Sequence, residues 1–148
     1  MRENTFLGRG MKFPPQINPA TGRFVTSENE QSVKESIYLI LMTQKTERFM
    51  RRDFGSRASS YVFGETDLTM LNLMAGQLRS DILSNEPRVA SVDVKLDYNS
   101  KPGCLFVNIA CQIRGRNVTE NMVFPFYLGE APKEEETEYE AVEDDNIQ

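Results

Sequence analysis

The chain has 148 residues, 39% of them hydrophobic, and a formal net charge of −5. That length predicts one domain with extensions, and no apolar run approaches the roughly 18 residues of a membrane-spanning helix. Histidine is absent, which excludes histidine-based catalytic triads and histidine-ligated metal sites. Cys104 and Cys111 fall in one strand-like run, where an extended backbone would hold them about 23 Å apart, so we expect two reduced thiols.

Acidic residues are concentrated near the C-terminus. Residues 130–148 contain nine carboxylates and one lysine, which leaves residues 1–129 mildly basic. Because few of its residues are apolar, we predict that segment 129–148 is a disordered acidic tail. The N-terminus lacks the apolar stretch of a secretory signal, so we expect synthesis in a cytoplasm and no membrane partner.

The N-terminal quarter of the chain predicts an arm followed by a helix. Residues 1–26 are rich in glycine and proline, which favours an irregular arm. Ser27 and Glu30 then have the spacing of a helix capping box. The next apolar residues recur at helical spacing and predict a first helix that fades near residue 43.

Residues 43–64 form a long segment without helical or strand periodicity, and ordered loops of this length tend to be functional. Its candidate partner-binding residues are Glu47, Arg48, Arg51, Arg52, Phe54 and Arg57. Three interpretations stay open: a solvated surface with ordinary ion pairs, a docking surface for an acidic protein, and contacts to nucleic-acid phosphates. No recognisable nucleic-acid-binding fold surrounds the cluster, so we expect no nucleic-acid partner.

A second helix is predicted over about residues 66–84, with Asn85 closing it in a left-handed conformation and Pro87 preventing its continuation. Three segments of alternating polarity follow, which predict strands over 92–98, 105–113 and 118–126. The expected fold class is α+β, with two helices packed on a three-stranded antiparallel sheet over residues 27–128.

Such a sheet has two edges with unpaired backbone groups. Pro125 cannot donate a hydrogen bond to a neighbouring strand, which fits an edge position for the third strand. An extended segment of another chain can pair at such an edge. The residues expected to receive it are Val118, Glu120, Met122 and Phe124. The alternative is that the N-terminal arm or the acidic tail of the same molecule covers this edge.

Catalytic chemistry has little support in the sequence. Gly8-Arg9-Gly10 lacks the Gly-Lys-Ser/Thr ending of a phosphate-binding loop, and two cysteines cannot make a structural zinc site. We expect no enzyme, cofactor or metal. A glycosidase needs only two carboxylates across a cleft, which keeps that class open. The carboxylates concerned are Asp53, Glu65, Asp67 and Glu86.

Several short motifs occur in one order along the chain. They are Gly8-Arg9-Gly10, Phe13-Pro14, Ile40–Thr43, Glu47-Arg48, Asp53-Phe54-Gly55, Val62-Phe63 and Glu86-Pro87-Arg88. Over roughly residues 8–127, this series resembles the baseplate wedge family of contractile-tailed bacteriophages, type VI secretion systems and contractile injection systems. That family usually has glycine before the Glu/Ser-Arg pair, where this chain has Thr46.

The resemblance implies a structural protein of the inner baseplate. Glu86 and Arg88 would make charged contacts to the helical core bundle of the wedge proteins, with Pro87 fixing their geometry. The sheet would accept strands from sheath subunits and so template the first sheath ring. The resemblance also implies six copies around the tail tube, with contacts to tube or hub, after assembly in a host or producer cytoplasm. The alternatives are a peptidoglycan-cleaving tail enzyme and a nucleic-acid-binding module that uses Arg48–Arg57.

Overall fold

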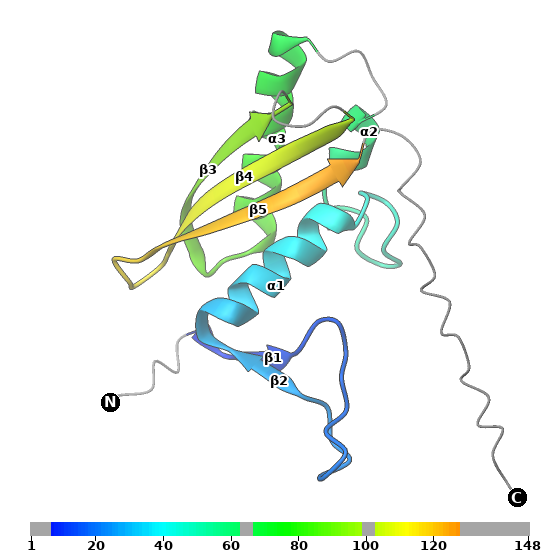
Figure 1. Cartoon of the computed structure of the whole chain (residues 1–148), viewed down its shortest axis with the longest axis vertical. Coiled ribbons are helices and arrows are strands. Elements are labelled where there is room, and N and C mark those ends of the chain that lie inside the picture. The colour runs from blue at the N-terminus through cyan, green and yellow to red at the C-terminus, as the bar shows by residue number, and fades with distance from the viewer. Residues whose placement is uncertain (1–6, 63–66, 99–102, 128–148) are drawn as a thin grey trace, which may run out of the picture.

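The computed structural model describes residues 7–62, 67–98 and 103–127 of the chain. The elements are β1 (Arg9–Met11), β2 (Thr26–Glu28), α1 (Asn29–Met42), α2 (Ala58–Val62), α3 (Leu68–Asn85), β3 (Val89–Asp97), β4 (Cys104–Ile113) and β5 (Thr119–Tyr127). The larger sheet is antiparallel in the order β3-β4-β5, so β4 is central. The long helices lie on one side of it (Figure 1). This confirms the predicted α+β class; the short helix α2 was not predicted.

The core lies between the helices and one face of the sheet. Its buried residues are Val33, Ile37 and Leu41 on α1, Met74, Leu78 and Ile82 on α3, and Val107, Ile109, Cys111 and Ile113 on β4. Burying an aliphatic side chain of this size contributes roughly 1.5–3 kcal/mol. Cys104 and Cys111 are buried free thiols, which confirms the prediction of two unpaired cysteines. Burial raises the pKa of the Cys111 thiol.

The helix boundaries correct two sequence predictions. α1 begins at Asn29 after Glu28, without a side-chain cap, so the predicted Ser27 capping box is wrong. Ser27 lies in β2 instead, where its hydroxyl donates a hydrogen bond of 2.6 Å to the Glu35 carboxylate. Asn85 belongs to α3 rather than adopting a left-handed conformation, and its amide donates to the backbone carbonyl of Asp81. The Ser27 side chain thus bonds eight residues along the chain, whereas the Asn85 side chain bonds back within its own helix.

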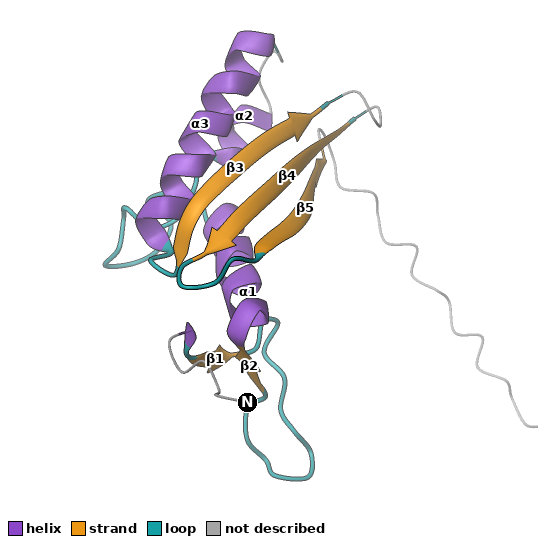
Figure 2. Cartoon of the chain, turned by 90° about the vertical axis from the view of Figure 1, so that its left-hand side faces the viewer, coloured by secondary structure: helices purple, strands orange, loops and turns teal. Residues whose placement is uncertain are grey.

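The N-terminal arm is more regular than its composition predicts. β1 and β2 pair in antiparallel fashion, and Arg9 bridges Glu28 across the pair at 2.5 Å. Ile17 and Phe24 form a further bridge in the connecting segment, so residues 9–28 are a long hairpin that projects beside α1 (Figure 2). The predicted disordered tail, residues 129–148, lies outside the described residues.

Candidate protein-binding sites

Glu86, Pro87 and Arg88 form the corner between α3 and β3. Glu86 is only 2% exposed. Arg88 donates from Nε to Oε1 and from Nη2 to Oε2 of Glu86, both at 2.7 Å, so the two side chains form a bidentate ion pair. The backbone N–H of Arg88 donates to Oε1 as well, at 3.1 Å. The sequence fixes this geometry locally, because Pro87 cannot continue the helix and sends the chain into β3.

The same guanidinium connects two other segments of the chain. Nη1 of Arg88 donates to the backbone carbonyl of Leu7 at 2.9 Å and to the hydroxyl of Ser32 at 3.2 Å. Leu7 is buried just before β1, and Ser32 lies in the first turns of α1. The Arg88 side chain therefore holds the N-terminal segment and α1 against the end of α3.

Hydrogen bonding keeps both members of this pair charged. Burial alone would raise the pKa of Glu86, but hydrogen bonds from Arg88 and Ser36 outweigh it and hold that pKa below its ordinary value. The hydrogen bonds to Glu86 raise the pKa of Arg88 in turn. Both Glu86 oxygens are engaged within the chain, so Pro87 and part of Arg88 are the exposed portions of this corner.

Residues 43–57, named the basic loop below, are ordered by their own backbone. Ser56 donates its N–H to the carbonyl of Thr43 at 2.8 Å and its hydroxyl to the carbonyl of Leu41 at 2.9 Å. Gly55 adopts φ +110°, and a Cβ there would lie 2.4 Å from the Thr43 oxygen. Thr46 adopts φ +77°, a left-handed conformation that is unusual for a β-branched residue. The chain thus keeps a conformation suited to glycine at the position where the family usually has one.

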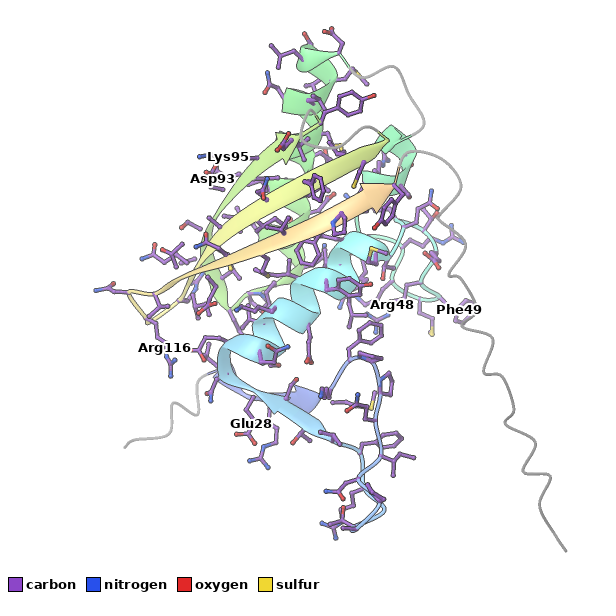
Figure 3. The ribbon with its side chains drawn as sticks, in the orientation of Figure 1. Glu28, Arg48, Phe49, Asp93, Lys95 and Arg116 are labelled. Atoms are coloured by element: carbon purple, nitrogen blue, oxygen red, sulfur yellow. The ribbon has the colours of Figure 1, made fainter. Side chains whose placement is uncertain are left out.

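The basic loop is attached to the rest of the molecule at its base and is exposed at its tip. At its base, Lys45 Nζ lies 2.5 Å from Oδ1 of Asp81, a residue of α3 that is 3% exposed. At its tip, Phe49 is 90% exposed and Met50 88% exposed. Figure 3 shows Phe49 and the neighbouring Arg48 projecting away from the sheet and helices. The loop is therefore anchored at one end and fully presented to solvent at the other.

The arginines of the basic loop form no ion pairs with the carboxylates that the structure describes. Arg48 and Arg51 lie over the ring of Phe54, with Cζ-to-centroid distances of 4.8 and 5.6 Å. Within residues 7–62, 67–98 and 103–127, no carboxylate forms an ion pair with any of the four. They are Arg48, Arg51, Arg52 and Arg57. The remaining predicted member, Glu47, instead accepts a hydrogen bond from the backbone N–H of Gln44.

The two edges of the larger sheet differ in charge. β3 carries Asp93 and Lys95, whose charged groups are 3.8 Å apart, and a register shift between Val89 and Ser91. Charges and bulges of this kind protect an edge strand from pairing. The exposed side chains of β5 are all uncharged. They are Thr119, Asn121, Val123, Pro125 and Tyr127. β5 is thus an edge strand, as the position of Pro125 indicated, and the less protected of the two.

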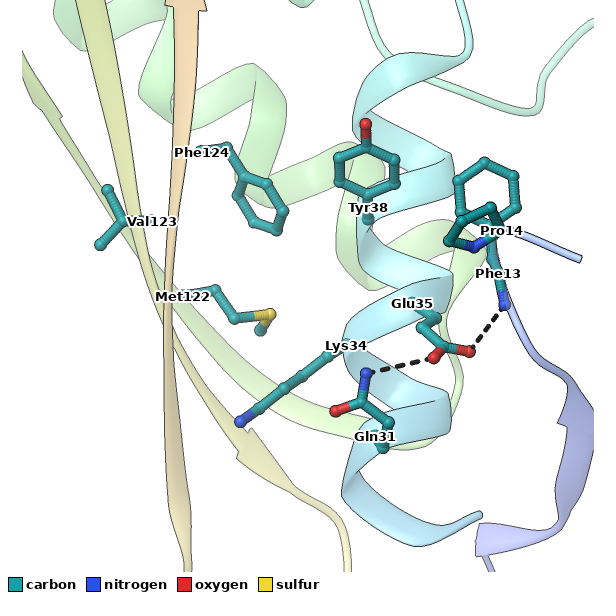
Figure 4. A pocket seen from close by; sticks show the side chains of 9 residues that line it. All are labelled: Phe13, Pro14, Gln31, Lys34, Glu35, Tyr38, Met122, Val123 and Phe124. Atoms are coloured by element: carbon teal, nitrogen blue, oxygen red, sulfur yellow. Dashed lines mark hydrogen bonds between the residues drawn. The ribbon is translucent and has the colours of Figure 1, made fainter. Parts of the chain in front are cut away.

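A groove of about 650 Å³ lies between β5, α1 and the N-terminal hairpin (Figure 4). Tyr38 stands in the middle of its apolar lining, with ring centroids 5.7 Å from Phe13 and 5.8 Å from Phe124. Met122 contributes a further apolar side chain. On the polar side, Lys34 forms an ion pair of 2.7 Å with Glu120 of β5. The groove therefore joins an uncovered strand edge to an aromatic surface.

Of the four residues predicted to receive a partner strand, three lie in β5. Glu120, Met122 and Phe124 are its more buried alternate residues, on the side of the helices. Val118 precedes the strand and is 44% exposed. Sequence reasoning missed Phe13 and Tyr38. Tyr38 breaks the polar face of the first helix, which is a usable signal, but only the fold of the hairpin brings Phe13 beside it.

Glycoside hydrolysis needs a carboxylic acid whose pKa is raised. Glu35 lines the groove. Burial alone would raise its pKa, but hydrogen bonds from the Ser27 hydroxyl, the Gln31 amide and the Phe13 backbone N–H outweigh it and hold the pKa low. The carboxylates considered from sequence lie elsewhere: Asp53, Asp67 and Glu86 do not line the groove, and Glu65 is outside the described residues.

Residues 7–62, 67–98 and 103–127 contain neither a candidate metal site nor a membrane-spanning helix. No group of histidine, cysteine, aspartate or glutamate there is placed to hold a metal ion. No helix among those residues is long and apolar enough to cross a bilayer.

The sequence profile of the family described as baseplate wedge protein gp25 matches residues 27–118, more than half of the chain. The chain belongs to this family. The order of motifs, and not any single motif, had indicated the same assignment. As a baseplate wedge protein, the chain is a component of contractile injection systems. No curated protein matches it.

Three solved structures resemble this wedge protein. A Geobacter sulfurreducens protein described as a candidate tail lysozyme is 34% identical with a TM-score of 0.61, over 74% of this chain and 100% of that one. A chain of the anti-feeding prophage baseplate is 20% identical (TM-score 0.57; 84% and 89% covered). A chain of the type VI secretion baseplate complex is 18% identical (TM-score 0.57; 67% and 93% covered). At 18–20% identity, the last two comparisons show a shared fold and nothing more.

Proposed function

We propose that this wedge protein is a non-enzymatic baseplate subunit that starts the contractile sheath by accepting an extended segment of a sheath subunit along β5. The observation that carries the proposal is the edge strand β5, whose exposed side chains are uncharged, beside the aromatic groove. α1 lies on the far side of that groove (Figure 4). A strand added to β5 would pair its backbone with the edge and lie over the exposed side of α1.

The groove gives the added strand a place for its side chains. In strand addition, backbone hydrogen bonds supply affinity and pockets for alternate side chains supply specificity. Residues of the added strand that face the helices would contact Tyr38 and Phe13, whose rings are already aligned with Phe124. A sheath segment with apolar residues at alternate positions fits this surface.

Lysine substitutions on the two edges test the proposal. Val123→Lys and Tyr38→Lys each place a charge at the groove, and both side chains are exposed enough to leave the fold intact. Ser91→Lys adds the same charge to the β3 edge as a control. We expect binding to purified sheath subunits to weaken by at least about tenfold in the groove variants, because a charge buried without a partner costs more than about 1.4 kcal/mol. Unchanged binding in both groove variants would exclude addition at β5.

The Glu-Pro-Arg corner is the proposed docking point for the other wedge proteins, in a ring of six copies around the tail tube that also touches tube or hub. Pro87 is exposed there, and the Glu86–Arg88 pair holds it in place. Pro87→Asp should abolish binding to the wedge core bundle while the unfolding midpoint stays unchanged. Ala90→Asp, at an exposed site just inside β3, is the matched control. Full binding by Pro87→Asp would place the docking point elsewhere.

A peptidoglycan-cleaving enzyme is the second candidate, because the Geobacter relative carries that description. Glu35 is the carboxylate that an enzyme would use in the groove, and its lowered pKa does not suit a general acid. Turbidity clearing of purified cell walls by the full chain, abolished by Glu35→Gln, would establish the enzyme. We expect no clearing by either form.

A further inference from the structure

The basic loop carries five cationic and two acidic residues and has an apolar tip, and its arginines form no ion pair with a carboxylate in the described part of the chain. Arg48 and Arg51 are held side by side on one ring, with Arg52 next to them in sequence. The Lys45–Asp81 contact fixes the base of the loop on α3, so the cluster is a presented surface with a defined position. Arginines held in this way are pre-organised to bind carboxylates.

The rest of the chain contains a segment of opposite charge. Residues 130–148 carry nine carboxylates and one lysine, whereas residues 1–129 carry a small positive excess. The described chain ends at Tyr127 of β5, and that strand contacts α2. α2 directly follows the basic loop, so the described chain ends on the same side of the molecule as the loop (Figure 1).

We propose that the acidic segment 134–145 of the same chain binds across the basic loop. Each residue extends a chain by at most about 3.5 Å, so the seven residues from Tyr127 to Glu134 span up to roughly 25 Å. Attachment through so short a linker gives the segment an effective concentration of about millimolar at the loop, above that of a separate acidic partner. Its carboxylates pair with the guanidinium groups, and Tyr139 and Val142 lie within the same segment to meet Phe49 and Met50.

A single tryptophan at the loop tip reports on this contact in the full chain. The protein has no tryptophan, and Phe49 is 90% exposed, so Phe49→Trp gives one reporter without disturbing the core. Quenching by acrylamide measures how much of that reporter indole is covered. At low salt we expect the indole to be protected in the full chain, and protection to disappear as salt shortens the Debye length below about 5 Å.

Two sets of variants, each made in the Phe49→Trp chain, identify the partners. Replacing the glutamates of segment 134–145 with glutamine should raise the quenching constant to that of free tryptophan. Arg48→Gln, Arg51→Gln and Arg52→Gln together should do the same. The control is Arg23→Gln, Arg79→Gln and Arg114→Gln, an equal loss of charge at exposed sites outside the basic loop, and it should leave the reporter indole protected.

Two results would overturn the proposal. One is equal quenching in the chain with native carboxylates and in the chain with neutralised ones. The other is protection that falls on dilution of the protein, because a contact within one chain does not depend on concentration whereas a contact between copies does.

Discussion

The Glu86–Arg88 corner and the basic loop contain the same kind of residue in opposite surroundings. Arg88 is tied to a buried carboxylate, to the carbonyl of Leu7 and to a hydroxyl on α1. Arg52 and its neighbours have no ion-pair partner among the described residues, and Arg48 and Arg51 lie over the ring of Phe54. Arginine therefore has two roles in this chain. Arg88 stabilises the fold, whereas the arginines of the basic loop remain available to bind another segment.

The largest effect we expect comes from removing the inner arginine. Arg88→Ala leaves the Glu86 carboxylate buried without its cation and frees the N-terminal segment from α3. Breaking a buried pair by removing one partner typically costs about 3–5 kcal/mol. Urea unfolding monitored by circular dichroism should show this loss. A loss below about 1 kcal/mol would mean that the pair is far more hydrated than the 2% exposure of Glu86 indicates.

The pH dependence sharpens this prediction. The folded-state pKa of Glu86 is lowered from an ordinary value of 4.5. Its contribution to stability is therefore complete above pH 4.5 and is lost as the pH falls through the lower, folded-state pKa. Glu86→Gln cannot release or bind that proton, so the variant should lose less stability than the native chain between about pH 5 and pH 3.

The anchor of the basic loop comes second. Lys45→Met removes the cation that faces Asp81. Among the described residues, Oδ2 of Asp81 has no hydrogen-bond partner, and Oδ1 would then keep only the Gln77 amide. We expect a loss of about 2 kcal/mol, less than for Arg88 because part of the Lys45 side chain already faces water. Lys95→Met is the control, since its ion pair is exposed and should contribute less than about 0.5 kcal/mol. Equal losses in the two variants would contradict a special role for the anchor.

The spacing of apolar residues, with the residues that end helices and form turns, was enough to predict the long helices and the strands of the main domain. The alternating residues of β3, β4 and β5 and the stripe on α3 predict their elements to within a few residues, because each has one face in the core. The resemblance implied a partner contact for Glu86, and sequence order alone cannot tell which way a charged side chain turns. Its burial depends on Ser32, Ser36 and Leu7, which are distant from it along the chain.

The groove lay beyond sequence reasoning for the same reason. Glu35 reads as a solvated residue on a helix, yet it is 8% exposed because the hairpin brings the Phe13 N–H and the Ser27 hydroxyl to it. Thr46 is the opposite case. Only the family resemblance indicated that position 46 is unusual. The left-handed φ of +77° at Thr46 gives the physical reason, because glycine adopts that conformation without strain.

Thr46→Gly should therefore stabilise the protein. A β-branched residue in the left-handed region is strained by about 1–2 kcal/mol, and glycine removes that strain at some cost in unfolded-state entropy. We expect a net gain of about 1 kcal/mol in the free energy of unfolding. Gly55→Ala makes the reverse change in the same loop and should destabilise it, because its Cβ would meet the Thr43 carbonyl. If Thr46→Gly is destabilising, the Thr46 side chain makes a contact that offsets its strain.

The smallest effect on stability should come from the outer arginines, and that small effect is itself informative. Arg52→Ala deletes the same guanidinium as Arg88→Ala, but from an exposed site without an ion pair among the described residues, where substitutions usually change stability by no more than about 0.5 kcal/mol. Urea unfolding of the two variants side by side measures the contrast directly. A loss from Arg52→Ala that approaches the loss from Arg88→Ala would mean that the basic loop supports the fold. A loss within error would leave binding, and not stability, as the role of the arginines in the basic loop.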